Sequence, residues 1–231
     1  AAQKVLYAEA RQKRAEIIPA ANVKAIQVQP PDLEGQHIKL QSRFFQFDNV
    51  HFTLLGNYQL GNLAVAISTV EILMEHNFRV EEKHIQEALN HFKMPGRLEV
   101  LQRNPLVIGD VAHNPQGARA LANSLQNLLP DRSRVLVCGF LDDKDSKANL
   151  KALGEDSRIA VISRPQGDRS SNWRAVPQFW KELYPHKNCY VAESITTAVQ
   201  RGLDSLREDE YLLITGSFYL LDEARKYFLQ N

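Results

Sequence analysis

From residue 99 to its end, the chain alternates short apolar segments with longer amphipathic ones, and this alternation limits its possible folds more than any other feature. Short runs of consecutive apolar residues are typical of strands buried on both faces of a sheet. The segments between them repeat apolar residues about one helical turn apart. The pattern predicts an α/β fold in which a doubly wound, mostly parallel sheet carries helices on both faces, joined by right-handed crossovers.

The same alternation places the individual elements. Strands are predicted over residues 99–102, 106–110, 134–138, 159–163, 189–191 and 211–214. Helices are predicted over residues 115–128, 146–153, 173–184, 194–206 and 217–228. Because parallel strands all end at one edge of their sheet, polar residues that follow a strand are expected to gather there, where open α/β sheets bind their ligands.

Residues 1–93 follow a different pattern, which does not complete an architecture of its own. Strong helix formers fill residues 2–16, and an extended segment at 23–28 precedes a hairpin whose predicted turn is Asp48-Asn49. The hairpin strands are 38–47 and 50–54, and the helices that follow run from Gln59 to about His76 and over 81–92.

A hinge signal separates the two patterns. Pro95-Gly96 stands between them, and proline followed by glycine breaks both helices and strands. We therefore expect a domain remnant at residues 1–93, an interdomain linker at 94–98 and a second domain at 99–231.

Composition narrows the class of protein. The formal net charge is +1, so no broad basic field indicates binding to nucleic acid. No apolar run approaches the roughly 20 residues that a transmembrane helix needs, and no signal-peptide pattern opens the chain. The two cysteines, Cys138 and Cys189, lie in apolar segments and are expected to be buried thiols. We expect a cytoplasmic protein that binds neither membrane nor nucleic acid.

Two side chains follow the strand predicted at 106–110, at the mouth of the next helix. Asp110 could accept hydrogen bonds from ribose hydroxyls or hold a cation, and it could equally cap the helix that begins at Pro115. His113 could contact phosphate, helped by the helix dipole, or it could be a turn histidine satisfied by backbone groups. The residues alone leave both pairs of alternatives open.

Three further candidates lie before that strand. Arg97 occupies the hinge, where a guanidinium could swing onto a phosphate when two domains close; otherwise it is an exposed arginine paired with Glu99. Asn62 and Gln59 lie near the start of a helix, where their amides could read the edge of an adenine or could simply cap the helix.

Two more candidates follow other strands of the sheet. Lys144 lies in the turn at 139–145, where it could meet an anionic substrate or belong to a solvated charged turn. Ser217 lies between the last strand and the last helix, a place that can bind an anion or be a plain junction.

Several familiar motifs are absent from the sequence. It contains no Gly-x-x-x-x-Gly-Lys-[Ser/Thr] phosphate loop, no Gly-x-Gly-x-x-Gly dinucleotide fingerprint and no Gly-x-Ser-x-Gly nucleophile elbow. Its histidines and cysteines show no zinc-ligand spacing. A nicotinamide-dependent oxidoreductase is therefore only a distant possibility.

Taken in order and at this spacing, the polar segments resemble the C-terminal part of the folylpolyglutamate synthase/dihydrofolate synthase family, within the Mur ligase superfamily. The matching segments are residues 56–64, 95–99, 110–115, 144–145 and 215–219. Each is weak alone, but together they cover the chain from about residue 50 to the end.

The resemblance implies an ATP-dependent ligase. Such an enzyme activates a folate or dihydropteroate carboxylate as an acyl phosphate, which the amine of L-glutamate then attacks. It implies that Asn62 contacts the adenine side of the nucleotide, Arg97 the phosphates and Asp110 the ribose. His113 would lie near the γ-phosphate or the acyl phosphate. The Rossmann-like C-terminal domain would hold glutamate, through Lys144 and Ser217.

In that family the phosphate loop, the magnesium ligands and a modified lysine belong to an N-terminal ATPase half that does not occur in this sequence. We expect residues 1–93 to be the tail of that P-loop-type domain, and ATP and Mg²⁺ to bind mainly to the absent half. The chain alone is then expected to be inactive, and residues 1–93 to expose apolar surface. Two alternatives stay open: a related cell-wall peptide ligase, and a non-catalytic module that binds an anionic small molecule or a partner chain.

Overall fold

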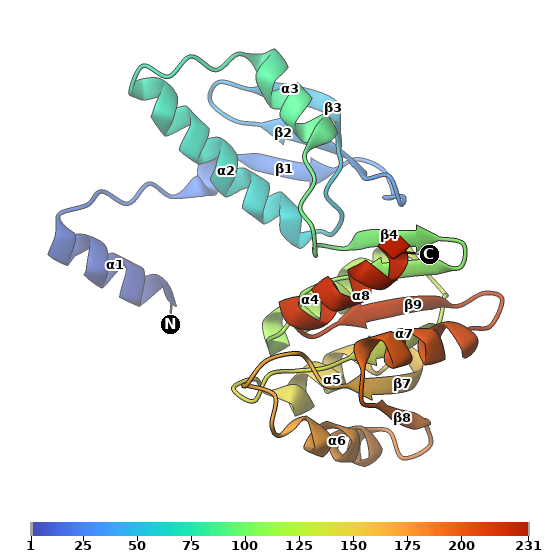
Figure 1. Ribbon diagram of the computed structural model, residues 1–231. Coiled ribbons are helices and arrows are strands. Elements are labelled where there is room, and N and C mark those ends of the chain that lie inside the picture. Colours follow the sequence, from blue (N-terminus) through green and yellow to red (C-terminus); the bar gives the residue numbers. More distant parts are fainter. Residues whose placement is uncertain (1, 231) are drawn as a thin grey trace.

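A computed structural model describes residues 2–230 and arranges them in two parts (Figure 1). The first part contains a three-stranded antiparallel sheet, and the second a six-stranded sheet covered by helices. The chain passes from one part to the other at Gly96, a buried glycine whose φ of 76° lies in the left-handed region. The two sheets therefore lie on opposite sides of Gly96 in the chain.

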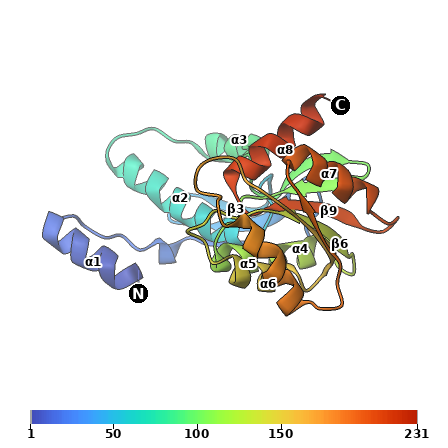
Figure 2. The same cartoon turned by 60° about the horizontal axis from the view of Figure 1, so that its bottom comes forward.

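The first part packs two helices against its small sheet. Its sheet has the order β1-β2-β3, and the core between sheet and helices includes Ile38, Leu40, Leu63 and Leu89. The elements are α1 (Ala2–Lys13), η1 (Ala20–Asn22), β1 (Lys24–Gln27), β2 (Gln36–Gln41), β3 (Gln46–Phe52), α2 (Tyr58–Glu75) and α3 (Glu82–His91). Helix α1 stands away from both sheets (Figures 1 and 2).

The prediction for the β2–β3 turn is wrong. The chain reverses between Ser42 and Phe45, where the Ser42 N–H donates to the Phe45 carbonyl at 2.9 Å. Asp48 and Asn49 lie inside β3 instead. There the Asp48 carboxylate accepts from Lys39 at 2.7 Å, and Asn49 bonds His37 at 2.9 Å. These cross-strand partners hold a turn-favouring pair in extended conformation.

The second part is a doubly wound sheet, as predicted. Its strand order is β4-β5-β9-β6-β7-β8, and all neighbours pair in parallel except β4 with β5. Its elements are β4 (Glu99–Arg103), β5 (Leu106–Gly109), α4 (Pro115–Leu128), β6 (Arg134–Cys138), α5 (Ser146–Leu153), β7 (Ser157–Ser163), η2 (Trp173–Ala175), α6 (Val176–Leu183), β8 (Cys189–Ala192), α7 (Ile195–Asp204), β9 (Tyr211–Thr215) and α8 (Phe218–Gln230).

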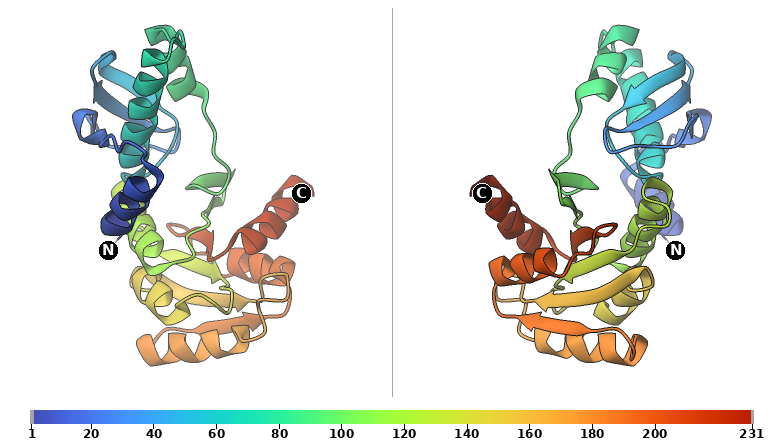
Figure 3. Two further views of the ribbon diagram at one scale, coloured as in Figure 1. Left: turned by 90° about the vertical axis from the view of Figure 1, so that its left-hand side faces the viewer. Right: turned by 90° about the vertical axis from the view of Figure 1, so that its right-hand side faces the viewer.

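Helices cover both faces of this sheet. Residues of α4, α5 and α6 share one apolar core with the sheet, and residues of α7 and α8 share another. Figures 2 and 3 show the two groups of helices on opposite sides of the strands. Both cysteines are free, with Cys138 fully buried.

The strand order reverses next to β9, which lies between β5 and β6. The carboxyl ends of these three strands therefore form the switch point at which sheets of this kind bind ligands. Gly216 follows β9 with a φ of 117°, and a Cβ atom there would lie 2.4 Å from the Gly139 carbonyl oxygen. Only glycine allows the two loops to approach so closely.

Candidate functional site

A cavity of about 190 Å³ opens at this carboxyl edge, between the start of α2, the linker and the start of α4. It brings together four of the seven residues singled out from the sequence: Asn62, Arg97, Asp110 and His113. Its remaining lining residues are Tyr58, Val111, Ala112, Asn114, Gly117 and Ala120. Residues from both parts of the molecule thus meet in one hollow.

Asp110 connects the linker to the mouth of α4. One carboxylate oxygen, Oδ2, accepts from the Leu98 N–H at 2.9 Å and from the Tyr58 hydroxyl at 3.4 Å. The other, Oδ1, accepts from the Ala112 N–H at 2.8 Å. Burial raises the pKa of this carboxyl, while the two N–H groups and the charge of Arg97 oppose the rise.

The linker is strained where Asp110 holds it. Leu98 is only 2% exposed and has a φ of 45°, a left-handed conformation that a residue with a branched side chain rarely adopts. Its N–H donates to Asp110, and its side chain packs in the core of the second part. Such a conformation persists only where its surroundings determine it fully, and here the Asp110 carboxylate does so.

The cap of α4 is Asn114 and not Asp110. The Asn114 Oδ1 accepts from the Gly117 N–H at 2.8 Å, and Pro115 occupies the first turn. This is an ordinary helix N-terminus, in which a short polar side chain and a proline satisfy the first turn. The capping alternative for Asp110 is therefore excluded, and its carboxylate is directed to the linker instead.

The turn of residues 110–114 is fixed from three directions. The Asp110 N–H donates to the Ile214 carbonyl in β9, and the Val111 N–H donates to the Gly96 carbonyl in the linker, both at 3.0 Å. The Asn149 amide of α5 donates to the His113 carbonyl at 3.2 Å. Since its backbone groups are bonded to the sheet, the linker and a helix, the turn is held rigidly.

The ring of His113 has one nitrogen engaged and one free. Its Nδ1 lies 2.9 Å from the Val111 carbonyl oxygen, and a carbonyl only accepts, so Nδ1 carries the proton. Nε2 is left to accept a hydrogen bond or, in the imidazolium form, to donate one. A backbone group therefore satisfies only one of the two ring nitrogens, Nδ1.

Arg97 is not paired with Glu99. The Glu99 carboxylate accepts from the Gly96 N–H at 2.8 Å and from Arg225 of α8 at 2.5 Å. Arg97 makes one long bond of 3.3 Å to the Gly96 carbonyl and lies over the ring of Phe218. Within residues 2–230 it forms no ion pair, so its guanidinium keeps most of its N–H groups for a ligand.

Tyr58 is a cavity residue that the sequence analysis did not single out. It follows the predicted hairpin directly, and its ring packs against the core of the second part. Burial and the nearby charge of Asp110 raise the pKa of its hydroxyl, so it remains a neutral donor. Its only sequence signal was its place between Asn57 and Gln59.

Gln59 and Asn62 form a pair on α2 rather than a cap. The Asn62 Nδ2 donates to the Gln59 Oε1 at 2.8 Å, and the N-cap residue Asn57 makes no side-chain cap bond. Asn62 is exposed and lines the cavity, whereas Gln59 is only 2% exposed. The pairing leaves the Asn62 Oδ1 for another donor.

Lys144 and Ser217 do not line this cavity, although both lie beyond strands that end at the same edge. The Lys144 Nζ bonds the Asp143 carboxylate at 2.7 Å and is partly exposed. The Ser217 Oγ is 3% exposed and accepts from the Leu220 N–H at 3.1 Å, which caps α8. The geometry gives Ser217 a structural bond and leaves Lys144 accessible.

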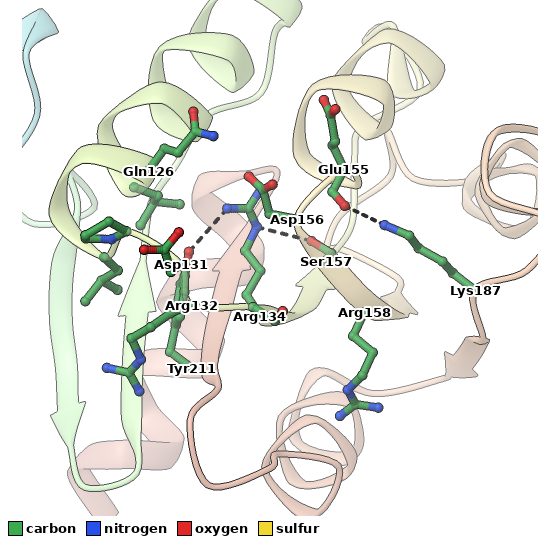
Figure 4. A pocket seen from close by; sticks show the side chains of 14 residues that line it. Gln126, Asp131, Arg132, Arg134, Glu155, Asp156, Ser157, Arg158, Lys187 and Tyr211 are labelled. Carbon is green, nitrogen blue, oxygen red and sulfur yellow. Dashed lines mark hydrogen bonds and ion pairs between the residues drawn. The ribbon is translucent and has the colours of Figure 1, made fainter.

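A larger polar hollow, of about 430 Å³, lies at the opposite edge of the same sheet (Figure 4). Arg134, only 1% exposed, donates there to Ser157, to the Tyr211 hydroxyl and to the Leu153 carbonyl at 2.9–3.2 Å. Lys187 donates to the Gly154 carbonyl at 2.8 Å and the Glu155 carbonyl at 2.5 Å. These cations satisfy the end of α5, so size alone does not identify the binding site.

The first part of the chain exposes the apolar surface expected of it. Of the sixteen exposed large hydrophobic residues in the described part of the chain, twelve lie between Val5 and Met94. An apolar groove of about 410 Å³ runs between α2, α3 and β3, lined by Phe52, Leu63, Ile67, Ile85 and Phe92 among others. Exposed apolar surface of this extent is typical of a face that another part of a protein covers.

Within residues 2–230, no helix is both long and apolar enough to cross a bilayer. Nor do these residues hold a group of three or more histidine, cysteine or acidic side chains that could bind a metal ion.

Sequence comparison places the second part in a known family. The profile of the family described as "Mur ligase, glutamate ligase domain" matches residues 96–218. The chain is 27% identical over 182 residues to a dihydrofolate synthase/folylpolyglutamate synthase of Buchnera aphidicola, covering 79% of this chain and 41% of that protein. It is 27% identical over 197 residues to a folylpolyglutamate synthase of Lacticaseibacillus casei, covering 84% and 44%.

Solved structures agree with this likeness. The Mycobacterium tuberculosis folylpolyglutamate synthase, solved with ADP and AMPPCP, gives a TM-score of 0.85 at 25% identity, covering 98% of this chain and 52% of that one. The Thermotoga maritima folylpolyglutamate synthase gives 0.77 at 26% identity, covering 99% and 52%. The chain therefore spans about half the length of the proteins that it resembles.

Proposed function

The chain belongs to the Mur ligase family, of which it carries the glutamate ligase domain, and we propose that it is the C-terminal part of a cytoplasmic, ATP-dependent folylpolyglutamate synthase/dihydrofolate synthase. The reaction joins L-glutamate to a folate or dihydropteroate carboxylate through an acyl phosphate. The observation that carries the proposal is the meeting of Asn62, Arg97, Asp110 and His113 in one cavity at the switch point of the sheet.

Asp110 and Asn62 suit the nucleoside of ATP. A carboxylate has about four acceptor positions, and three at Asp110 are occupied by Leu98, Tyr58 and Ala112. One position on Oδ1 remains and would accept a ribose hydroxyl. The Asn62 Oδ1 is not engaged by Gln59 and would accept from the adenine amino group.

Arg97 and His113 suit the phosphates. The guanidinium of Arg97 has N–H groups to spare and would bind phosphate oxygens in a bidentate manner. The free Nε2 of His113, at the positive end of α4, would donate to the γ-phosphate or acyl-phosphate oxygens. Both groups would stabilise the negative charge that develops as glutamate attacks.

Lys144 and Ser217 are proposed for the glutamate side of the site. Both follow strands that end at the carboxyl edge, and within residues 2–230 the Lys144 ammonium group bonds only the partly exposed Asp143. Its ammonium group would take a glutamate carboxylate. Ser217 would contribute less, because its hydroxyl oxygen already caps α8 and only the O–H remains to be donated.

The phosphate loop and the Mg²⁺ site are proposed to lie in a half that precedes residue 1. Residues 1–93 would be the tail of that ATPase domain, 94–98 the linker and 99–231 the glutamate-ligase domain. Mg²⁺, when bound there, would neutralise phosphate charge. Closure about the linker would bring Arg97 onto the phosphates and exclude water from the acyl phosphate.

The test is an ADP-release assay with ATP, Mg²⁺, glutamate and either dihydropteroate or tetrahydrofolate. The chain is assayed alone and together with the P-loop half of the same protein. Activity is expected only in the combination, and Arg97→Ala and His113→Ala should abolish most of it.

A folded combination that binds ATP and yet releases no ADP with either folate would contradict the proposal. Cell-wall peptide acceptors would then be assayed in place of folates. Failure with those as well would favour a non-catalytic binding module descended from a ligase.

A further inference from the structure

Asn149 is a fully buried polar side chain next to the proposed site, and it does not line the cavity. It belongs to α5, whose other buried residues are Leu150 and Leu153, and it is 0% exposed. Its Nδ2 donates to the His113 carbonyl at 3.2 Å. Its Oδ1 is buried and meets no hydrogen-bond donor among the described residues.

This arrangement is unfavourable for folding. A buried amide that makes one neutral hydrogen bond and leaves its oxygen unpaired loses more in desolvation than it gains. A leucine of similar size would fill the same space on this apolar face of α5 without burying a polar group. A residue that opposes stability at such a place is expected to serve the site.

What Asn149 contacts is the turn that carries His113. The sheet and the linker bond Asp110 and Val111 at the start of this turn, and the Asn149 amide bonds the carbonyl of His113 itself. The ring of His113 is in turn oriented by its Nδ1–H bond back to the Val111 carbonyl at 2.9 Å. The two bonds together determine where Nε2 points.

We propose that Asn149 is a positioning residue: its amide fixes the His113 turn so that the ring keeps its Nδ1–H bond to the Val111 carbonyl and, in the imidazolium form, directs the Nε2–H group at the anion. The proposal rests on the proposed function, in which His113 faces the γ-phosphate or acyl phosphate. Helix α5 begins just after Lys144, with Asp145 as its cap. The helix that carries Asn149 therefore lies between His113, proposed for the phosphate, and Lys144, proposed for glutamate.

The first test uses this chain alone. In Asn149→Leu, ¹⁵N spectra of the imidazole rings should show His113 exchanging between tautomers, whereas the unaltered chain shows the Nδ1–H form. His113→Gln identifies the signal among the seven histidines. Retention of the single tautomer in Asn149→Leu would overturn the proposal, whatever the protein's activity.

Gln36 supplies a matched control. It is 1% exposed, donates to the Leu54 carbonyl at 2.6 Å and has a buried, unpaired Oε1, so its chemistry repeats that of Asn149 in the first part of the chain. Gln36→Met removes the same groups and should leave the His113 spectrum unchanged. If the His113 spectrum changes equally in Asn149→Leu and Gln36→Met, the change comes from a general loss of stability and not from the bond between Asn149 and the His113 carbonyl.

The second test is kinetic and uses the chain combined with its P-loop half. Misplacement of a group by about 1 Å costs about 100-fold in rate, so Asn149→Leu should lower kcat about 10- to 100-fold with little change in KM for glutamate. Gln36→Met should keep kcat. An inactive unaltered enzyme would refute the proposed function but leave the tautomer result standing.

Asn149→Asp covers the case in which the leucine variant does not fold. It keeps the shape of the side chain, and it donates to the His113 carbonyl only while protonated. Its His113 spectrum should therefore match the unaltered chain at low pH and depart from it as pH rises. A spectrum that matches at every pH would overturn the proposal.

Discussion

At the amino edge of the six-stranded sheet, Arg134 and Lys187 donate to the last carbonyl groups of α5, and Arg158 binds both oxygens of Glu210. At the carboxyl edge, Arg97 makes one long backbone bond and His113 keeps Nε2 free. Both edges are polar and both hold arginine. They differ in how much hydrogen-bonding capacity their cations have left.

The direction of the helices explains the difference. Helices α4 and α5 end at the amino edge, where unpaired carbonyl groups attract cations, and they begin at the carboxyl edge, where N–H groups favour anions. An anion at the amino edge would compete with carbonyl oxygens for Arg134 and Lys187. The smaller cavity is therefore the better candidate for a nucleotide, although it has less than half the volume of the other.

The largest effect is expected for Arg97→Ala in the complete ligase. Removal of a preorganised donor to developing charge costs about 10²- to 10³-fold in rate, so kcat/KM for ATP should fall by that factor. Arg103→Ala is the control, because Arg103 forms an exposed ion pair with Glu34 at 2.5 Å. An equal fall of kcat/KM in Arg97→Ala and Arg103→Ala would show that an arginine with unused N–H groups is no more important for ATP than one held in an ion pair.

Arg134→Met should affect folding and not catalysis. It leaves the Tyr211 hydroxyl without the Arg134 donor and the Leu153 carbonyl with the Ser157 hydroxyl alone, at 2.7 Å. The free energy of unfolding should fall by about 2–3 kcal/mol, measured by urea denaturation. The activity of the folded fraction should be unchanged. A raised KM for ATP with unchanged stability would contradict this account, because it would place the nucleotide at the amino edge of the sheet.

Lys144→Ala should act on one substrate only. Its exposed ion pair with Asp143 contributes little, so stability should change by less than about 0.5 kcal/mol. Loss of a charged hydrogen bond to a carboxylate should raise KM for glutamate about tenfold, with KM for ATP unchanged. The measurement is steady-state kinetics with each substrate varied in turn. If Lys144 is only a solvated turn lysine, Lys144→Ala will change neither the KM for glutamate nor the KM for ATP.

The smallest expected effect is on the pH dependence of stability. Hydrogen bonds from Arg158 lower the pKa of Glu210, so this residue adds stability above the pKa of an unfolded glutamate and loses it as pH falls. Burial raises the pKa of Asp110, so this residue costs stability as pH rises past the pKa of an unfolded aspartate. Urea titrations between about pH 3 and 6 cover both ranges.

The two corresponding variants should therefore change the pH profile in opposite directions. Glu210→Gln should flatten the rise of stability with pH, and Asp110→Asn should steepen it. Changes in the same direction would show that the two edges do not differ electrostatically in the way described.

Local chemistry made much of the second part predictable. Helices α4 and α5 have the predicted bounds, because Asn114-Pro115 and Asp145 are strong start signals and act on neighbours within four residues. The buried strands were equally clear from their apolar runs. The Asp48-Asn49 turn failed because its competing partners, Lys39 and His37, belong to the neighbouring strand.

The sequence predicted which residues meet at the site, but it did not predict which hydrogen bonds they form. Four of the seven residues meet as the order of the polar segments indicated, while their roles remain predictions. Pairing with Glu99 was the alternative considered for Arg97, but the partner of the Glu99 carboxylate is Arg225, which lies 126 residues away. Asn149 could not be recognised at all, since nothing near it in the sequence shows that His113 is its partner.

The most direct test of the difference between the edges is a titration with ADP and Mg²⁺, followed by ¹⁵N–¹H spectra of the labelled chain combined with its P-loop half. The amide signals of residues 110–117 and the side-chain signals of Asn62 and Arg97 should shift, while those of residues 131–134 and 155–158 stay in place. Shifts confined to the latter two segments would contradict the assignment of the nucleotide to the carboxyl edge.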